Sequence, residues 1–165
     1  MIELRKITWD DWEECMELEV TDKQDDFIAS NEYSLAQAYI GLLNDKYPPM
    51  TFTIYHNDLL VGFTMLYYQD YECNDGSNYE EKPCYTILRF MIDKKYQGQS
   101  LGKQAMVKLL EYIRTFPNGK AVAVHLSYNP QNDVARKLYQ SFGFIETGQF
   151  TSDDEDAEVV AKLVL

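Results

Sequence analysis

The chain has 165 residues, of which 45% are hydrophobic and 14% aromatic, so it can bury the core of one globular domain and is not expected to be disordered. Its formal net charge of −12 disfavours nucleic acid as a partner. Residues 1–20 lack the apolar stretch of a signal peptide, and no apolar run is long enough to span a membrane. The three cysteines have no paired spacing, which favours reduced thiols. We therefore expect a cytoplasmic protein.

The N-terminal third is predicted to form a short strand and two helices. Ile2–Lys6 is the strand. Thr8 and Asp11 predict a capping box before a first helix, whose apolar face would hold Trp9, Trp12 and Met16.

An irregular acidic connection is predicted over Asp22–Asn31. Ser34 and Gln37 then predict a second capping box, and the helix that follows ends at Pro48 and Pro49. Its predicted apolar stripe is Leu35, Ala38, Tyr39, Leu42 and Leu43.

The remaining elements alternate between strands and helices. Strands are predicted over Met50–Tyr55, Leu59–Gln69, Cys84–Ile92, Ala121–Ser127, Phe144–Phe150 and Glu158–Leu165, with a polar loop over 70–82. Helices are predicted over Leu101–Arg114 and from the N-cap Asn132 to Gly143. This order predicts a mixed α/β domain without repeats or linkers, covering residues 1–165.

The segment 90–103 leads from an apolar, strand-like run into a helical pattern through a loop with two glycines and a serine. In such an arrangement, the backbone N–H groups at the helix N-terminus hold a phosphate. Gly98 and Gly102 let the backbone approach a ligand closely, because no Cβ stands in the way. The segment is therefore predicted to bind a phosphorylated ligand.

The same loop resembles the pyrophosphate loop of the GCN5-related N-acetyltransferases (the GNAT family), whose pattern is Gln/Arg-x-x-Gly-x-Gly/Ala. The residues that fill the pattern are Gln97, Gly98, Gln99, Ser100, Leu101 and Gly102. Ser100 stands where the family usually has glycine; if a positive φ is needed there, serine costs roughly 1 kcal/mol or more. The resemblance implies a mostly antiparallel central sheet flanked by helices, with acetyl-CoA as co-substrate and a primary amine as acceptor.

Residues 129–144 resemble a later motif of the same family, an asparagine followed by an Ala-x-x-Leu-Tyr helix that ends in Gly-Phe. Two motifs in the family's order are more specific than either alone. By this resemblance Tyr139 is the general acid that protonates the departing CoA thiolate. A phenol of pKa ~10 can do so for a thiol of pKa ~8.5 where the site favours the transfer. The alternative is that Tyr139 is only a core aromatic residue.

Further CoA contacts are implied by the resemblance. Phe90, Met91 and Ile92 would offer backbone groups to the pantetheine arm where the central strands splay apart. Asn132 would contact the same arm, or serve only as a helix cap. Lys103 and Lys137 are candidates for the CoA phosphates, although a solvated surface role is equally open for each. With two histidines in the chain, no metal site is expected.

The acceptor amine must lose a proton before it attacks. With an amine pKa of ~10.4, about one molecule in a thousand is neutral near pH 7.4, which costs about 4 kcal/mol. In some family members a glutamate on the central strand accepts this proton, but Tyr85–Ile92 contains no acid. We therefore expect a water relay that another acidic side chain could reach, and the sequence does not identify that side chain.

Charge is distributed unevenly along the chain. Residues 89–137 carry a balance of +6 and the remainder −18. Ten acids and one lysine lie between Asp10 and Glu32, and Ser152–Asp156 adds four acids. Such a field would attract a polycation in a salt-dependent way, although each single acid can equally be a solvated surface residue.

Residues 27–38, 89–93 and 96–98 are similar to bacterial spermine/spermidine acetyltransferases of the Bacillus type. This resemblance implies a polyamine acceptor, and we take Glu32 and Tyr33 as candidate acceptor contacts. Two alternatives stay open: another cationic amine, such as an aminoglycoside-like antibiotic or a peptide amine, and a CoA-binding module with little turnover. The exposed final strands lead us to expect a homodimer without nucleic-acid or membrane partners.

Overall fold

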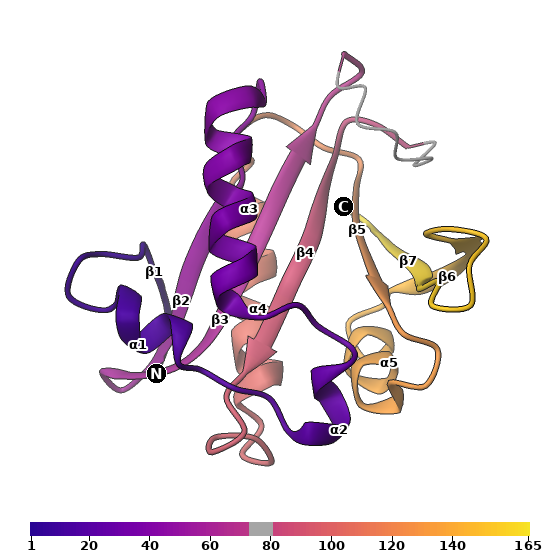
Figure 1. Ribbon diagram of the computed structural model, residues 1–165. Coiled ribbons are helices and arrows are strands. Elements are labelled where there is room, and N and C mark those ends of the chain that lie inside the picture. The colour runs from indigo at the N-terminus through magenta and orange to yellow at the C-terminus, as the bar shows by residue number, and fades with distance from the viewer. Residues whose placement is uncertain (73–80) are drawn as a thin grey trace.

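The computed structural model describes residues 1–72 and 81–165 (Figure 1). The strands are β1 (Ile2–Arg5), β2 (Met50–His56), β3 (Leu59–Gln69), β4 (Cys84–Ile92), β5 (Ala123–Tyr128), β6 (Ile145–Phe150) and β7 (Val159–Val164). The helices are α1 (Trp12–Met16), α2 (Asp22–Asp25), α3 (Asn31–Asn44), α4 (Leu101–Ile113) and α5 (Asp133–Gln140). The predicted polar loop between β3 and β4 lies mostly outside the described residues.

These strands form one sheet in the order β1-β2-β3-β4-β5-β7-β6, and the fold is mixed α/β as predicted. Neighbouring strands are antiparallel except β4 and β5, which are parallel. The parallel pairing covers only Cys84–Ile87 on β4 and Ala123–Leu126 on β5. Among the described residues, the rest of β4 has no pairing partner on that side, so the two strands splay apart in the middle of the sheet.

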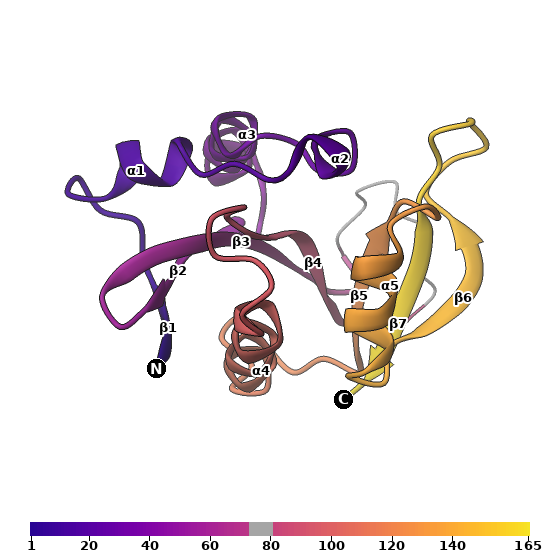
Figure 2. The same ribbon diagram turned by 90° about the horizontal axis from the view of Figure 1, so that it is seen from below.

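Helices cover both faces of this sheet (Figure 2). On one face, α1, α2 and α3 lie over an apolar cluster that includes Cys15, Phe63 and Met65. On the other face, α4 and α5 close a larger cluster that includes Leu109 and Tyr139. The sheet is thus a buried middle layer, and its splay opens between two covered faces.

The first helices differ from the prediction. The stretch 22–31, predicted to be irregular, contains α2 and the start of α3, and Thr21 forms a capping box with Gln24. In the preceding turn, the Asp11 carboxylate accepts from the backbone N and Oγ1 of Thr8, at 2.6 and 2.9 Å. The bond from the Thr8 backbone N is one half of the predicted capping box. However, α1 begins only at Trp12, and Trp9, predicted on its apolar face, is 90% exposed.

Helix α3 begins before the predicted capping box. Ser30 is its N-cap and accepts from the backbone N of Tyr33, at 3.3 Å. The predicted apolar stripe is wrong at three positions, because α3 meets the sheet only along a narrow face. The residues that pack there are Leu35 and Ala38, whereas those that stay about 60% exposed are Tyr39, Leu42 and Leu43.

Candidate active site

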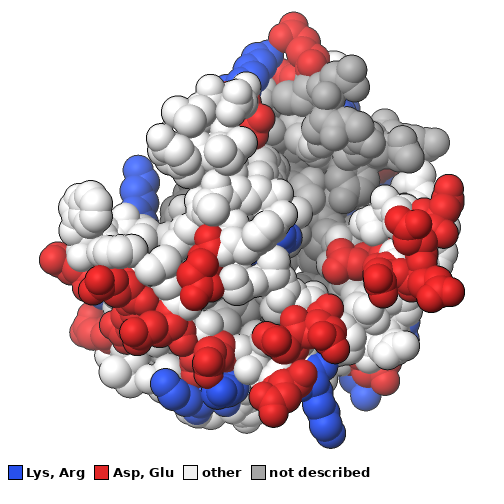
Figure 3. Space-filling model, viewed as in Figure 1, with Lys and Arg blue, Asp and Glu red and all other residues white. Residues whose placement is uncertain are grey.

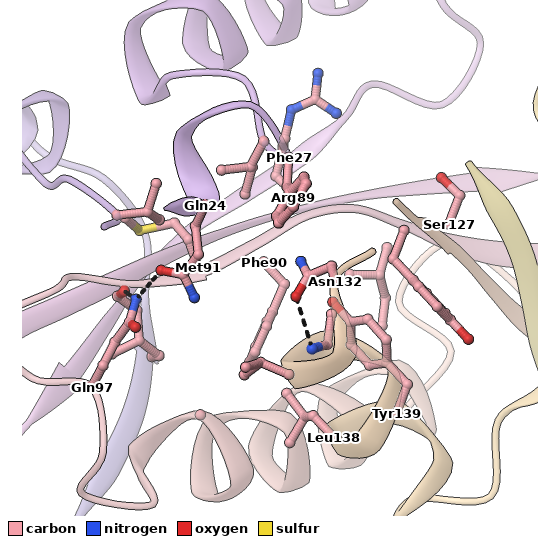
Figure 4. Close-up of a pocket in the computed structure, with 18 of the residues that line it drawn as sticks. Gln24, Phe27, Arg89, Phe90, Met91, Gln97, Ser127, Asn132, Leu138 and Tyr139 are labelled. Carbon is pink, nitrogen blue, oxygen red and sulfur yellow. Dashed lines mark hydrogen bonds between the residues drawn. The ribbon is translucent and has the colours of Figure 1, made fainter. Parts of the chain in front are cut away.

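The splay between β4 and β5 opens into a cavity of about 780 Å³. Its walls come from β4, the end of β5, the loop before α4, α5, the residue before β7 and the α2 segment (Figure 4). Segments far apart in sequence therefore meet at one place, and both motifs singled out in the sequence contribute to it.

Strand β4 presents free backbone groups to this cavity. The backbone N of Asp93 donates to Val61 O, and Thr64 Oγ1 donates to Arg89 O, both at 2.8 Å. The backbone N–H and C=O groups of the odd-numbered residues in this part of β4 therefore face β3. Because backbone groups alternate along a strand, those of Phe90 and Ile92 face the splay. The Ile92 carbonyl accepts from Gln97 Nε2 at 2.8 Å, which leaves the groups of Phe90 open to a ligand.

The loop before α4 presents a second set of donors. Within the described part of the chain, the backbone N–H groups of residues 98–103 donate to no acceptor, and the first turn of α4 contains no acidic residue. Gly98 has φ 77° and Ser100 has φ 61°, so the positive φ considered for Ser100 is observed. Unsatisfied N–H groups at the N-terminus of a 13-residue helix fit the diphosphate of acetyl-CoA.

Gln97 fastens this loop to its surroundings. Its Nε2 donates to Ile92 O and, at 3.0 Å, to Gln24 Oε1 on α2. The same Gln24 oxygen accepts from Thr21 Oγ1 at 2.9 Å. The glycine loop, the end of β4 and α2 are therefore joined through two amide side chains.

Tyr139 is a buried residue of the cavity wall on α5. Its side chain is 8% exposed, and its ring packs at 5.6 Å from Tyr128 and 5.9 Å from Phe144. The hydroxyl has no hydrogen-bond partner among the described residues, and Figure 4 shows it pointing toward the middle of the cavity. Burial, followed by the charges of Glu158 and Tyr128, raises the pKa of Tyr139, so the phenol holds its proton at neutral pH.

Of the other residues predicted to contact CoA, some line the cavity and some do not. Asn132 caps α5, as predicted, because its Oδ1 accepts from the backbone N of Ala135 at 3.1 Å, and it also lines the cavity. Lys103 lines the cavity from the first turn of α4. Lys137 and Gln99 are exposed and are not part of the cavity wall. Met91 lines the cavity, but its side chain packs into the cluster beneath α1 and α3.

Arg89 places a cation at the opposite wall. Its guanidinium donates to Ser34 Oγ at 3.2 Å, Gln37 Oε1 at 3.3 Å and Leu88 O at 2.9 Å. No carboxylate of the described residues lies within ion-pair distance of it. Burial lowers the pKa of Arg89, which the nearby charge of Glu158 partly offsets.

A second cavity of about 500 Å³ adjoins the first, and the two share wall residues such as Val20 and Met91. Five acids line it: Glu17, Glu19, Asp22, Asp25 and Glu32. Its lysine, Lys94, is paired with Glu19 at 2.6 Å. Glu32 thus faces this second cavity, whereas Tyr33 is 63% exposed and lines neither.

Acidic side chains also dominate the outer surface around the cavities. Figure 3 shows them gathered over α1 and α2 and again over the turn between β6 and β7. In the part of the chain that the structure describes, there is no group of three His, Cys, Asp or Glu side chains able to hold a metal. The described helices include none with the length and apolarity needed to cross a membrane.

The sequence did not single out several residues of the cavity wall. Arg89 and Ser127 come from β4 and β5, and Glu158 directly precedes β7. Gln24 and Phe27 come from a segment predicted to be irregular. Periodicity marks a strand residue as inward or outward, but it does not show which strands separate. The splay, which makes these residues part of one wall, is a property of the sheet order and has no local signal.

Comparison with known proteins agrees with this geometry. The model of the acetyltransferase (GNAT) family matches residues 2–144. A probable spermine N(1)-acetyltransferase of Bacillus subtilis subsp. natto (strain BEST195) is 30% identical over 159 residues, which are 96% of this chain and 97% of that protein.

Two solved structures share the fold. An aminoglycoside acetyltransferase in complex with coenzyme A superposes with a TM-score of 0.75 at 18% identity, covering 99% of this chain and 95% of its own. The spermidine N-acetyltransferase from Vibrio cholerae in complex with CoA and spermine gives a TM-score of 0.69 at 18% identity, with the same coverage of 99% and 95%. At these identities the two structures bear on the fold alone.

Proposed function

The chain belongs to the GNAT family of acetyltransferases, and we propose that the amine it acetylates with acetyl-CoA is a primary amine of a polyamine such as spermidine or spermine. The observation that carries this proposal is the acid-lined second cavity, which adjoins the cavity that would hold the acetyl group. A polyamine has further ammonium groups beyond the reacting one, and carboxylates along its path would hold them.

The name of the Bacillus relative supports the same acceptor, since that protein is described as a probable spermine acetyltransferase. The acids over α1, α2 and the β6–β7 turn add a negative field around the opening. We infer that the reacting amine enters from this acidic side, while acetyl-CoA enters from the side of α4 and α5.

We infer that acetyl-CoA is held mainly by backbone groups. The N–H groups of residues 98–103 would take the diphosphate, Phe90 would bond the pantetheine arm, and Lys103 would add a positive charge. When bound, acetyl-CoA supplies the activated acetyl group. Tyr139 would hold a proton at Oη for the sulfur, because its hydroxyl faces the cavity without a competing partner.

The position of Arg89 supports a second candidate for the acceptor, an amine that also carries a carboxylate, such as a short peptide. A half-buried guanidinium with only neutral hydrogen-bond partners would attract such an anion and repel a polycation. We rank this candidate second, because the acids of the adjoining cavity outnumber the single arginine.

The test is release of CoA thiol from acetyl-CoA with a panel of acceptors: spermine, spermidine, a simple monoamine, kanamycin and a short peptide with a free amino group. We expect kcat/KM to be highest for the two polyamines. Preference for kanamycin or the peptide would overturn the polyamine assignment while keeping the enzyme class. Binding of acetyl-CoA without turnover of any amine would favour the CoA-binding module.

We also propose that the chain forms a homodimer through the edge of the sheet. β6 is the last strand in the sheet order, and its exposed residues include Ile145 and Phe150. An unpaired edge with apolar side chains is a ready surface for a second copy. Light scattering coupled to size exclusion should give twice the monomer mass, and the monomer mass would refute this proposal.

A further inference from the structure

The cavity contains a carboxylate on the acceptor side that the sequence did not identify. No acid lies on the stretch of β4 where some family members place a proton acceptor. Among the described residues that line the first cavity, the acids are Asp26 and Glu158. Asp26 is exposed and lies just after α2, whereas Glu158 is half-buried and precedes β7 beside the splay.

Glu158 is held in a defined position. Ser127 Oγ donates to Glu158 Oε2, and both side chains line the cavity. The backbone of Glu158 is fixed as well, since its N donates to Thr151 Oγ1 at 3.0 Å and its O accepts from Thr151 N at 3.0 Å. The other Glu158 oxygen accepts from no described residue, so it can accept from a water or an ammonium.

Three other residues of the cavity wall interact with Glu158. Ser127 on β5 is its hydrogen-bond donor. Arg89 on β4 and Tyr139 on α5 line the same cavity, and the charge of Glu158 raises the pKa of each. The carboxylate thus lines the same cavity as the residue proposed to protonate sulfur.

We propose that Glu158, positioned by Ser127, accepts the proton that the amine nitrogen loses as it attacks the acetyl group, directly or through one water. This role applies to any primary amine, so it rests on the acetyltransferase reaction and not on the polyamine assignment.

The ammonium releases one proton to solvent, and the neutral nitrogen forms a C–N bond with the acetyl carbon. The nitrogen then gives a second proton to Glu158, while the C–S bond breaks and the sulfur takes a proton from Tyr139 Oη. Transfer of the Glu158 proton to Tyr139, through water, restores both residues. The net products are the acetylated amine, CoA thiol and one proton in solvent.

The charge of Glu158 links the proton transfer from nitrogen to Glu158 with the proton transfer from Tyr139 to sulfur. While Glu158 is ionised, it is the largest charge that raises the pKa of Tyr139, after burial itself. Once Glu158 carries the proton from nitrogen, that contribution disappears, and Tyr139 releases its proton more readily. The acid is therefore strengthened at the moment when the leaving sulfur needs it.

The test is the pH profile of kcat for Glu158→Gln, with the amine that turns over fastest in the panel. We expect kcat near neutral pH to fall by at least roughly tenfold. The KM for acetyl-CoA should stay close to that of the wild type. The loss should shrink as the pH rises, because hydroxide and buffer can then remove the proton. Ser127→Ala, which keeps the carboxylate but removes its donor, should give a smaller loss of the same kind.

Two results would overturn the proposal. If Glu158→Gln raises the KM of the amine and leaves kcat and its pH profile unchanged, Glu158 only binds the ammonium. If kcat falls equally at every pH and the protein unfolds at lower urea, the role is structural. Asp26→Asn removes the other carboxylate of the cavity and is the control for charge, since it should leave the shape of the pH profile unaltered.

Discussion

Ser100 is the residue at which this chain departs from the loop pattern of its family, and it adopts φ 61° and ψ 14°. A left-handed conformation costs a residue with a Cβ about 1–2 kcal/mol, and the extra freedom of glycine in the unfolded chain returns roughly 0.5–1 kcal/mol. The Ser100 side chain caps nothing in α4, so no hydrogen bond is lost on its removal.

Ser100→Gly should therefore raise the free energy of unfolding, by up to about 1 kcal/mol, in urea titrations. Affinity for acetyl-CoA should be unchanged, because glycine keeps the same N–H. Gln99→Gly is the matched control: Gln99 is exposed and has no positive φ, so this change should destabilise by roughly 0.5 kcal/mol. Equal losses in both variants would contradict the strain assigned to Ser100.

The hydroxyl of Tyr139 is expected to contribute to the rate of acetyl transfer. Tyr139→Phe keeps the ring that packs between Tyr128 and Phe144 and removes only a hydroxyl without a described partner. Single-turnover rates should fall by roughly 10²-fold or more, while the unfolding free energy and the KM for acetyl-CoA change little. Tyr112→Phe on α4 is the control and should retain the wild-type rate. A Tyr139→Phe variant with full activity would leave Tyr139 as a core residue.

At the scale of elements, the CoA loop depends on Gln97, which links it to β4 and α2. Gln97→Ala would remove both hydrogen bonds and let the loop move, so the Kd of acetyl-CoA should rise about fivefold, as expected for roughly 1 kcal/mol. Calorimetric titration with acetyl-CoA measures this Kd. Gln99→Ala, two residues away and exposed, should bind as the wild type does. The same Kd for both variants would show that the Gln97 link does not order the loop.

Element types were predictable where the local pattern and the tertiary environment agree. β3, α4 and the Asn132 cap of α5 occur close to their predicted bounds, because each has strong periodicity or a clear cap. The α3 stripe was not predictable from hydrophobicity, since Leu42 and Leu43 continue the pattern but stay exposed. The same holds for the candidate site. Gly98, Gly102 and Tyr139 belong to sequence motifs and could be predicted, whereas Glu158 becomes a cavity residue only because β7 pairs with β5 in the folded sheet.

At the scale of the whole molecule, the net charge of −12 concentrates over α1, α2 and the β6–β7 turn, the side from which we propose that the amine enters. Charges at the surface are screened over about 10 Å at 0.1 M salt. The KM for spermine should therefore rise several-fold between about 10 mM and 200 mM salt, and the KM for a monoamine should rise less.

The position of the acids should matter more for the capture of spermine than the total charge of the protein. Neutralising the turn acids with Asp153→Asn, Asp154→Asn and Asp156→Asn should raise the KM for spermine at low salt and flatten its salt dependence. Glu3→Gln, Asp58→Asn and Glu111→Gln make the same change in charge away from the β6–β7 turn, on β1, in the β2–β3 turn and on α4. Glu3 and Asp58 form exposed ion pairs with Arg5. Because exposed pairs contribute little to stability, this control should fold normally and keep the salt dependence of the wild type. If both triple variants shift the KM equally, the attraction comes from net charge alone, and the acids of the β6–β7 turn have no special role in capture.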